Sequence, residues 1–287
     1  LPMHVVDGVG MVWGSVRNPP QVKDPDARML GGHIGAGTSK YTDYDRAVTR
    51  RTIAWLENRQ RGGDDRPWCL YVGLVAPHFP LVAPPEFFDL YPLDKLPPTK
   101  LHPRDGHASH PWPKAQAEFM DSEIQFCDEE ERLTAIAAYF GLVSFTDHNV
   151  GQILTALEDT GFSADTRVFY TSDHGDNVGA RGMWGKSNLY EESAAVPLIA
   201  RGPGIEHGSC QTPVNLVDFA ATVLENFQID DAAISSGPGT SLLHTMRQPY
   251  DETKVTFSEY HAVGAATGAF MIRKGRWKYN YYVGHRP

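Results

Sequence analysis

The sequence contains 287 residues, enough to bury the core of one large α/β domain or of one domain with a small appendage. Hydrophobic residues make up 41% and charged residues 21% of the chain. No apolar run approaches the roughly eighteen residues that a membrane helix needs. The formal charge of −9, with no cluster of lysine or arginine, argues against nucleic acid as a partner. The composition therefore predicts a globular protein that neither spans a membrane nor binds nucleic acid.

The three cysteines, Cys69, Cys127 and Cys210, lie far apart in the sequence. Their spacing fits neither a zinc site nor a disulfide framework, so we expect packed thiols, with a single disulfide left open. The first six residues show no basic region, apolar core or cleavage site of a signal peptide. They do not indicate a compartment.

A helix is predicted from Thr42 to about Arg59, because Thr42–Asp45 has the pattern of a capping box. Residues 67–75 then form a continuous apolar run, which is typical of a strand buried on both faces. This strand would place His78 just after its carboxyl end. Residues 81–127 are rich in proline and histidine without a clear period, and we expect long loops there.

Beyond these loops the pattern changes from irregular to periodic. From Glu129, apolar residues recur at steps of three and four, which predicts a long helix that ends near Gly161. Short strands are predicted at 167–172 and 196–200. Thr212-Pro213 has the pattern of a helix start, with Leu216, Ala220, Val223 and Leu224 facing inward.

Three further strands are predicted at 254–260, 268–273 and 276–282, the last two joined in a hairpin at Lys274-Gly275. The earlier alternation of strands and helices predicts an α/β fold with a mostly parallel sheet flanked by helices. We expect a partial α/β domain over 1–262 and the beginning of a small, incomplete antiparallel subdomain over 263–287.

Asp173-His174-Gly175 is the sharpest local motif, a carboxylate and an imidazole that follow a predicted strand. At the turn after a strand, both side chains can converge on one cation, and glycine allows the backbone to turn tightly. A bare motif of this kind is equally typical of a helix cap beside a surface histidine, so the residues alone leave both interpretations open.

The longer segment TSDHGDNVGARGMWGKSNLYEESAAVPLI, residues 171–199, resembles the second signature region of the sulfatase family, in the alkaline-phosphatase superfamily. The resemblance implies that Asp173 and His174 ligate a divalent cation, usually Ca²⁺, and that Lys186 contacts the sulfate. Pro77-His78-Phe79-Pro80 resembles the family's His-x-Pro loop. By that resemblance, His78 reaches the sulfate or the oxygen of the leaving group, which a histidine can protonate near neutral pH.

Near the end of the sequence, Ser258–His261 and residues 271–279 resemble the last strand and first hairpin of the family's terminal subdomain. In sequence, the two segments are similar to those of choline-sulfatase-like or carbohydrate-sulfatase members of the family. The implied substrate is a small-molecule or carbohydrate sulfate ester, and the implied location is periplasmic or secreted. The oligomeric state stays unknown.

The nucleophile motif of the family is missing. Sulfatases carry Cys-x-Pro-x-Arg or Ser-x-Pro-x-Arg, whose first residue becomes formylglycine, and no cysteine or serine here stands in that pattern. We therefore expect the formylglycine, the other metal ligands and the N-terminal part of the fold upstream of residue 1, and no activity from this chain alone. A phosphodiesterase or phosphonate monoester hydrolase of the same superfamily, or a non-catalytic relative that binds sulfated ligands, remains an alternative.

Overall fold

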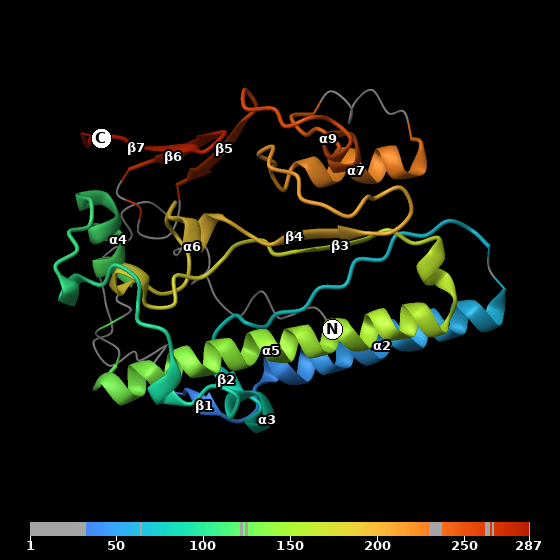
Figure 1. Ribbon diagram of the computed structural model, residues 1–287. Coiled ribbons are helices and arrows are strands. Elements are labelled where there is room, and N and C mark those ends of the chain that lie inside the picture. The colour runs from blue at the N-terminus through green and yellow to red at the C-terminus, as the bar shows by residue number, and fades with distance from the viewer. Residues whose placement is uncertain are drawn as a thin grey trace, which may run out of the picture.

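The computed structural model describes residues 33–63, 65–120, 123, 126–229, 237–261, 265 and 267–286. Two long helices, α2 (Lys40–Gly62) and α5 (Glu129–Asp159), lie side by side and run in the same direction (Figure 1). On one side of this helix pair lies a strand pair, and beyond the strands lie two shorter helices, α7 (Asp218–Phe227) and α9 (Leu242–Met246). The described residues thus form layers of helix, strand and helix.

The N-cap of helix α2 lies three residues before the predicted cap, Thr42. Ser39 is the N-cap: its side chain accepts from the Thr42 N–H at 3.2 Å, and Thr42 Oγ1 accepts from the Ser39 N–H at 2.9 Å. This is a reciprocal capping box with Thr42 in the third helical position. The predicted helix is confirmed, but Thr42 is the inner member of the box, and Asp45 is free to point into the protein.

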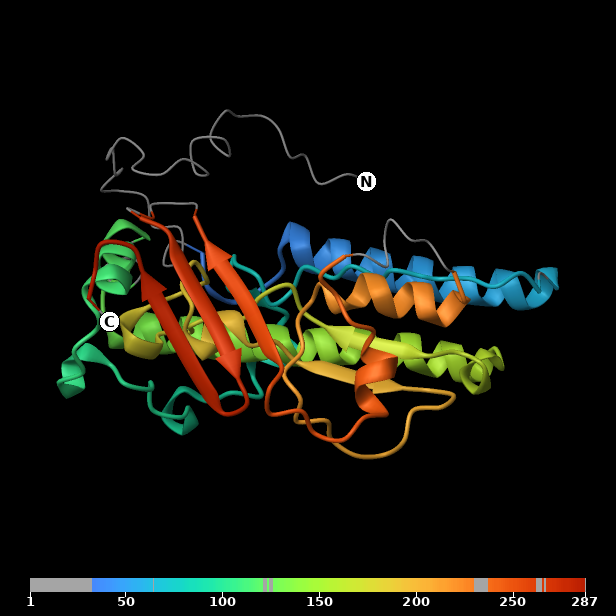
Figure 2. The same ribbon diagram turned by 90° about the horizontal axis from the view of Figure 1, so that it is seen from above.

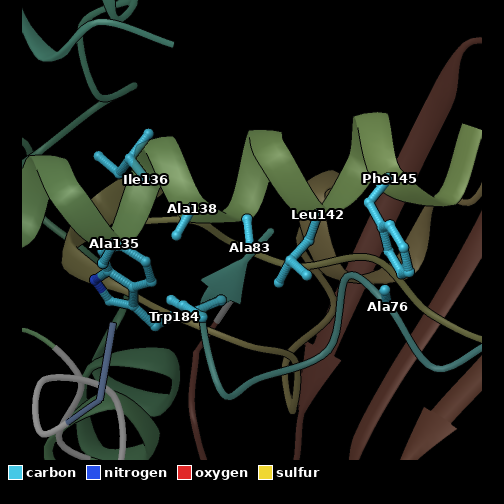
Figure 3. Packing of buried hydrophobic residues seen from close by; sticks show 9 residues of the cluster. Ala76, Ala83, Ala135, Ile136, Ala138, Leu142, Phe145 and Trp184 are labelled. Carbon is cyan, nitrogen blue, oxygen red and sulfur yellow. The ribbon is translucent and has the colours of Figure 1, made fainter. Parts of the chain in front are cut away.

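Helix α5 confirms the most extensive sequence pattern. Asp128 caps it by accepting from the Glu131 N–H at 2.8 Å, and Gly161 follows its end with a φ of 79°. Its inner face buries small and large apolar side chains alternately. Figure 3 shows this face packed against residues of the segment 76–83 and against an indole from the signature region; the labelled side chains are Ala76, Ala83, Ala135, Ile136, Ala138, Leu142, Phe145 and Trp184.

The predicted mostly parallel sheet is wrong for the described residues. Only β1 (Gly35–Ala36) and β2 (Val82–Ala83) pair in parallel, while β3 (Val168–Thr171) and β4 (Leu198–Arg201) are antiparallel. Both predicted strands exist, but the chain between them folds back to the same end of β3, so β4 runs in the opposite direction. A parallel pair would require a crossover to the far end of β3.

The apolar run at 67–75 is extended but forms no strand. No strand among the described residues pairs with it, and Tyr71 in its middle is 91% exposed. A strand requires ladder hydrogen bonds from a neighbour, which apolar composition alone does not supply. His78 therefore follows an extended segment, and not the carboxyl end of a strand as predicted.

The C-terminal part forms a three-stranded antiparallel sheet of β5 (Val255–Tyr260), β6 (Ala269–Lys274) and β7 (Trp277–Tyr282) (Figure 2). The predicted hairpin is confirmed, with Gly275 at a φ of 53° in its turn. Strand β5 pairs with β6 along its whole length. The predicted domain boundary between residues 262 and 263 lies outside the described residues.

Segment 81–127 is more regular than predicted. In addition to β2 it contains α3 (Pro85–Phe88), α4 (Pro111–Met120) and two short 3₁₀ turns, at 93–95 and 103–105. Helix α4 lies beside the C-terminal sheet, and Trp112 from its first turn is 2% exposed. Proline-rich composition concealed this helix because Pro111 and Pro113 occupy its first turn, where proline is tolerated.

The start predicted at Thr212-Pro213 is also wrong, since α7 begins at Asp218. Its buried face is polar: Asp218 accepts from the Thr240 N–H and Thr222 from the Leu242 N–H, each at 2.8 Å. Leu216 and Val223, predicted to face inward, are 37% and 40% exposed.

The three cysteines are free and exposed rather than packed. None of the helices in the described ranges combines the length and apolarity that a bilayer span requires.

Candidate functional site

The backbone just before the His78 loop is fixed by a carboxylate that the sequence did not single out for this role. The backbone N–H groups of Val75 and Ala76 donate to the two oxygens of Asp45, each at 2.8 Å. Asp45 is 1% exposed and projects from α2. Burial raises the pKa of Asp45, and the two backbone hydrogen bonds oppose that rise. Asp45 thus ties the base of the Pro77–Pro80 loop to the long helix.

His78 and Lys186 come together from positions 108 residues apart. The Nζ of Lys186 lies 2.8 Å from Nε2 of His78, and Nδ1 of His78 lies 2.9 Å from the carbonyl oxygen of Phe79. A carbonyl can only accept, so Nδ1 carries the proton and Nε2 accepts from the ammonium. The imidazole is therefore neutral in this arrangement, with a positive charge beside it.

The pKa shifts of this pair agree with that assignment. Burial lowers the pKa of His78, the Phe79 carbonyl opposes the change, and the charge of Lys186 lowers it further. Burial also lowers the pKa of Lys186, while Asp173 and Asp176 raise it. A partly buried ammonium beside an imidazole is a suitable place for an anion, because negative charge stabilises the ammonium and favours the protonated form of the imidazole.

Asp173 and His174 follow β3 and lie on the same side of the molecule as this pair. The rings of His78 and His174 are 6.3 Å apart between centroids. Nδ1 of His174 lies 2.8 Å from the Gly175 carbonyl oxygen, so it carries the proton and leaves the Nε2 lone pair available to a ligand. Nε2 lies 3.6 Å from Oδ2 of Asp173, whose side chain is 85% exposed.

This donor pair fits part of a metal site. The carboxylate and the unprotonated imidazole nitrogen are both metal ligands in the correct form. Within the described ranges, however, no group of three or more histidine, cysteine, aspartate or glutamate side chains is arranged to hold a metal ion. A hard cation such as Ca²⁺ takes six to eight oxygen ligands, so these two residues supply a minority of the set.

The four predicted site residues thus lie in one region. His78 follows the extended run at 67–75, and the other three follow β3. Asp45 was predicted only as a member of a helix cap, and no role of its own was predicted for Asp176. Asp176 accepts from the N–H groups of Val178 and Gly185, each at 2.9 Å, and burial raises its pKa. The only sequence signal for Asp176 was its place inside the signature segment.

The sequence model of the family described as Sulfatase matches residues 11–229. A choline-sulfatase from Rhizobium meliloti (strain 1021) is 33% identical over 278 residues, which cover 91% of this chain and 54% of that protein. The chain spans about half the length of the curated relatives it matches.

Two solved structures share the fold. A phosphonate monoester hydrolase from Silicibacter pomeroyi has a TM-score of 0.72 at 24% identity, over 92% of this chain and 58% of that chain. BT4656, in complex with its substrate D-glucosamine-2-N,6-O-disulfate, has a TM-score of 0.69 at 20% identity, over 86% of this chain and 62% of that chain. At these identities the likeness shows the fold alone. The family match over residues 11–229 and the 33% identity to the choline-sulfatase show that the chain belongs to the Sulfatase family.

Proposed function

We propose that this chain is part of a hydrolase of sulfate esters, with its anion site at His78 and Lys186. The observation that supports this most directly is the 2.8 Å contact between Lys186 Nζ and His78 Nε2, next to the Asp173-His174 pair. An ammonium is a suitable point charge for a tetrahedral oxyanion.

Each side chain would have a separate task. Lys186 would turn its N–H groups from His78 to the sulfate oxygens and neutralise their charge. This frees Nε2 of His78, and the nearby negative charge raises the pKa of the imidazole. His78 would then hold a proton at Nε2, facing the oxygen of the departing alcohol, and deliver it as the ester bond breaks.

Asp173 and His174 would hold a divalent cation, which we propose to be Ca²⁺. When bound, the cation would supply positive charge to the sulfate group and to the attacking group. The nucleophile would be a formylglycine outside these 287 residues, since no cysteine or serine here stands in the motif that is converted. The remaining metal ligands would also come from outside them.

The substrate class follows from the named relatives. We propose a small-molecule or carbohydrate sulfate ester, because a choline-sulfatase is among the relatives and a disulfated glucosamine is the substrate of one structural neighbour. A phosphonate monoester hydrolase is the main alternative, supported by the fold likeness to such an enzyme. A non-catalytic protein that binds sulfated ligands is a further alternative.

The test uses the full-length protein that contains this chain, with 4-nitrophenyl sulfate and a phenyl phosphonate ester as parallel substrates. Lys186→Ala and His78→Ala are each expected to lower kcat/KM for the sulfate ester by on the order of 10²–10³, the loss typical of one charge-stabilising or proton-transferring group. Lys95→Ala, an exposed lysine in the 93–95 turn, is the matched control and should keep wild-type activity.

The same assay tests the cation. Chelation should abolish turnover and added Ca²⁺ should restore it, while Asp173→Asn should raise the Ca²⁺ concentration needed. Higher activity on the phosphonate ester would favour the alternative enzyme. Binding of sulfated ligands without turnover of either substrate would favour the binding protein.

A further inference from the structure

The loop of residues 176–185, between His174 and Lys186, is closed at its neck by hydrogen bonds. Asp176 Oδ1 accepts from the N–H groups of Val178 and Gly185, each at 2.9 Å. Asn177 donates to the Gly185 carbonyl oxygen through its backbone N–H at 2.8 Å and its side-chain amide at 2.6 Å. Both backbone groups of Gly185 are therefore held, immediately before Lys186.

The backbone on either side of Lys186 needs this restraint. Gly185 has a φ of 62° and Ser187 a φ of 78°, so the chain turns through the left-handed region before and after the lysine. Such a conformation is unfavourable for serine and persists only where the surroundings fix it. Ser187 is 8% exposed and hydrogen-bonded to the Tyr260 side chain, which fixes the far side.

On the near side, Asn177 holds the carbonyl of Gly185, and one carboxylate holds its N–H group. Asp176 reaches Gly185 directly and reaches the start of the loop through Val178, whose φ of 44° also lies in the left-handed region. Without a side-chain acceptor at position 176, the N–H groups of Val178 and Gly185 would lose these partners, and only the Asn177 hydrogen bonds would close the neck. The ammonium of Lys186 would then be free to leave Nε2 of His78.

We propose that Asp176 is a positioning residue that clasps the 176–185 loop and so holds Lys186 against His78. It acts through Gly185 and does not itself contact the anion. The inference rests on the proposed function for the identity of the anion, whereas the clasp is a property of the loop. The two parts therefore need separate measurements.

The experiment compares Asp176→Ala and Asp176→Asn in the full-length protein. Inorganic sulfate is the probe, its Kd is measured by calorimetry, and hydrogen exchange is followed at the Gly185 amide. Asp176→Ala is expected to raise the sulfate Kd by on the order of tenfold, because the ammonium loses its fixed position, and to speed exchange at Gly185. Asp176→Asn keeps an acceptor oxygen for both N–H groups and should stay within about threefold of wild type.

Asp165→Ala, at an exposed position in the turn after α5, is the control and should match wild type in both readouts. If Asp176→Ala does not fold, Asp176→Glu replaces it, since the longer side chain moves the acceptor away from both N–H groups. Wild-type exchange at Gly185 in the Ala or Glu variant would overturn the clasp. Faster exchange with unchanged sulfate affinity would overturn the positioning of Lys186.

Lys186→Ala separates this inference from the proposed function. If that variant binds sulfate as tightly as wild type, the anion site itself is wrong. The exchange rate at Gly185 still decides whether Asp176 closes the loop.

Discussion

Glu192 lies in the segment that is hydrogen-bonded to the backbone of Gly175, next to His174, and its carboxylate binds two basic side chains that are distant in sequence. Its carboxylate accepts from Lys100 Nζ at 2.8 Å and from Arg181 Nη1 at 2.7 Å. Glu192 is the second residue of the short helix α6 (Glu191–Ala194), whose Ser193 carbonyl accepts from the Gly175 N–H at 2.8 Å. A Cβ at Gly175 would collide with the Glu192 carbonyl oxygen, so this contact requires glycine.

The pKa of Glu192 predicts how stability depends on pH. Burial alone would raise this pKa, but the hydrogen bonds from Lys100, from the Glu192 backbone and from Arg181, together with the Arg181 charge, outweigh burial and lower it from 4.5 to about 2. A folded-state pKa below the unfolded value means that the ionised carboxylate contributes stability above pH 4.5, and that this contribution is lost as the pH falls towards 2. Glu192→Gln should therefore cost on the order of 1–2 kcal/mol at pH 6 and flatten the fall in Tm between pH 5 and 3.

Thermal unfolding followed by circular dichroism at several pH values measures this change. Glu206→Gln, at an exposed position in the loop after β4, should keep the wild-type pH profile. If Tm falls with pH in the same way in wild type and in Glu192→Gln, the acid-dependent loss of stability does not come from Glu192.

Asp45 and Asp176 show why residue-level prediction was incomplete at the site. His78, Lys186, Asp173 and His174 carry side chains that the signature segments mark directly. Asp45 and Asp176 act by accepting backbone N–H groups, from residues thirty positions away in one case and within a nearby loop in the other. The buried face of α2 is largely polar, so hydrophobic periodicity could not reveal which of its residues point inward.

At the scale of the element, α5 contains two glycines whose substitution by alanine should have opposite effects. A Cβ at Gly141 would lie 2.9 Å from Ala83 Cβ and 3.2 Å from Phe88 Cα, whereas a Cβ at Gly151 would meet nothing within 4 Å. Gly151→Ala should stabilise the protein by roughly 0.5–1 kcal/mol through helix propensity. Gly141→Ala should destabilise it, by about 1–3 kcal/mol, because the helix must move away from β2 and α3.

Urea unfolding of the two variants decides this prediction, since both carry the same chemical change in the same helix. Stabilisation by both substitutions would mean that α5 does not pack as closely on residues 83–88 as the structure shows. Loss of stability in Gly151→Ala would mean that position 151 is not open.

The elements that the sequence predicted well are those defined by local chemistry. Helix α5 has its own cap, apolar period and terminal glycine, and the β6–β7 hairpin has its own turn. The wrong predictions concern which strands pair with one another. The run at 67–75 has the composition of a strand but no neighbouring strand among the described residues. Strand β4 pairs antiparallel with β3 because of the path of the loop before it. Pairing depends on residues distant in sequence, which a local pattern does not contain.

At the scale of the whole molecule, helices α4 and α6 attach the C-terminal sheet to the rest of the protein. An aromatic stack and a pair of ion pairs are among the contacts that cross this junction. Trp112 of α4 stacks on Tyr282 of β7 with ring centroids 4.9 Å apart, and its Nε1 donates to Thr267 Oγ1 at 3.1 Å. Glu191 of α6 pairs with Arg273 at 3.2 Å and Lys278 at 2.6 Å, but half of its side chain is exposed.

The more deeply buried contact should contribute more to the free energy of unfolding. Trp112 is 2% exposed, so Trp112→Ala should cost about 3–5 kcal/mol of unfolding free energy, through lost apolar contact and the cavity left behind. Glu191→Gln should cost at most about 1 kcal/mol, because water and salt screen an exposed ion pair. Trp277→Ala is the matched control, because it also replaces a tryptophan by alanine, in strand β7 of the C-terminal sheet. The Trp277 side chain is 70% exposed, so its loss should change the unfolding free energy by less than about 1 kcal/mol. Equilibrium urea unfolding gives all three values. A larger loss from Glu191→Gln than from Trp112→Ala would mean that ion pairs, rather than the buried aromatic stack, hold the sheet in place.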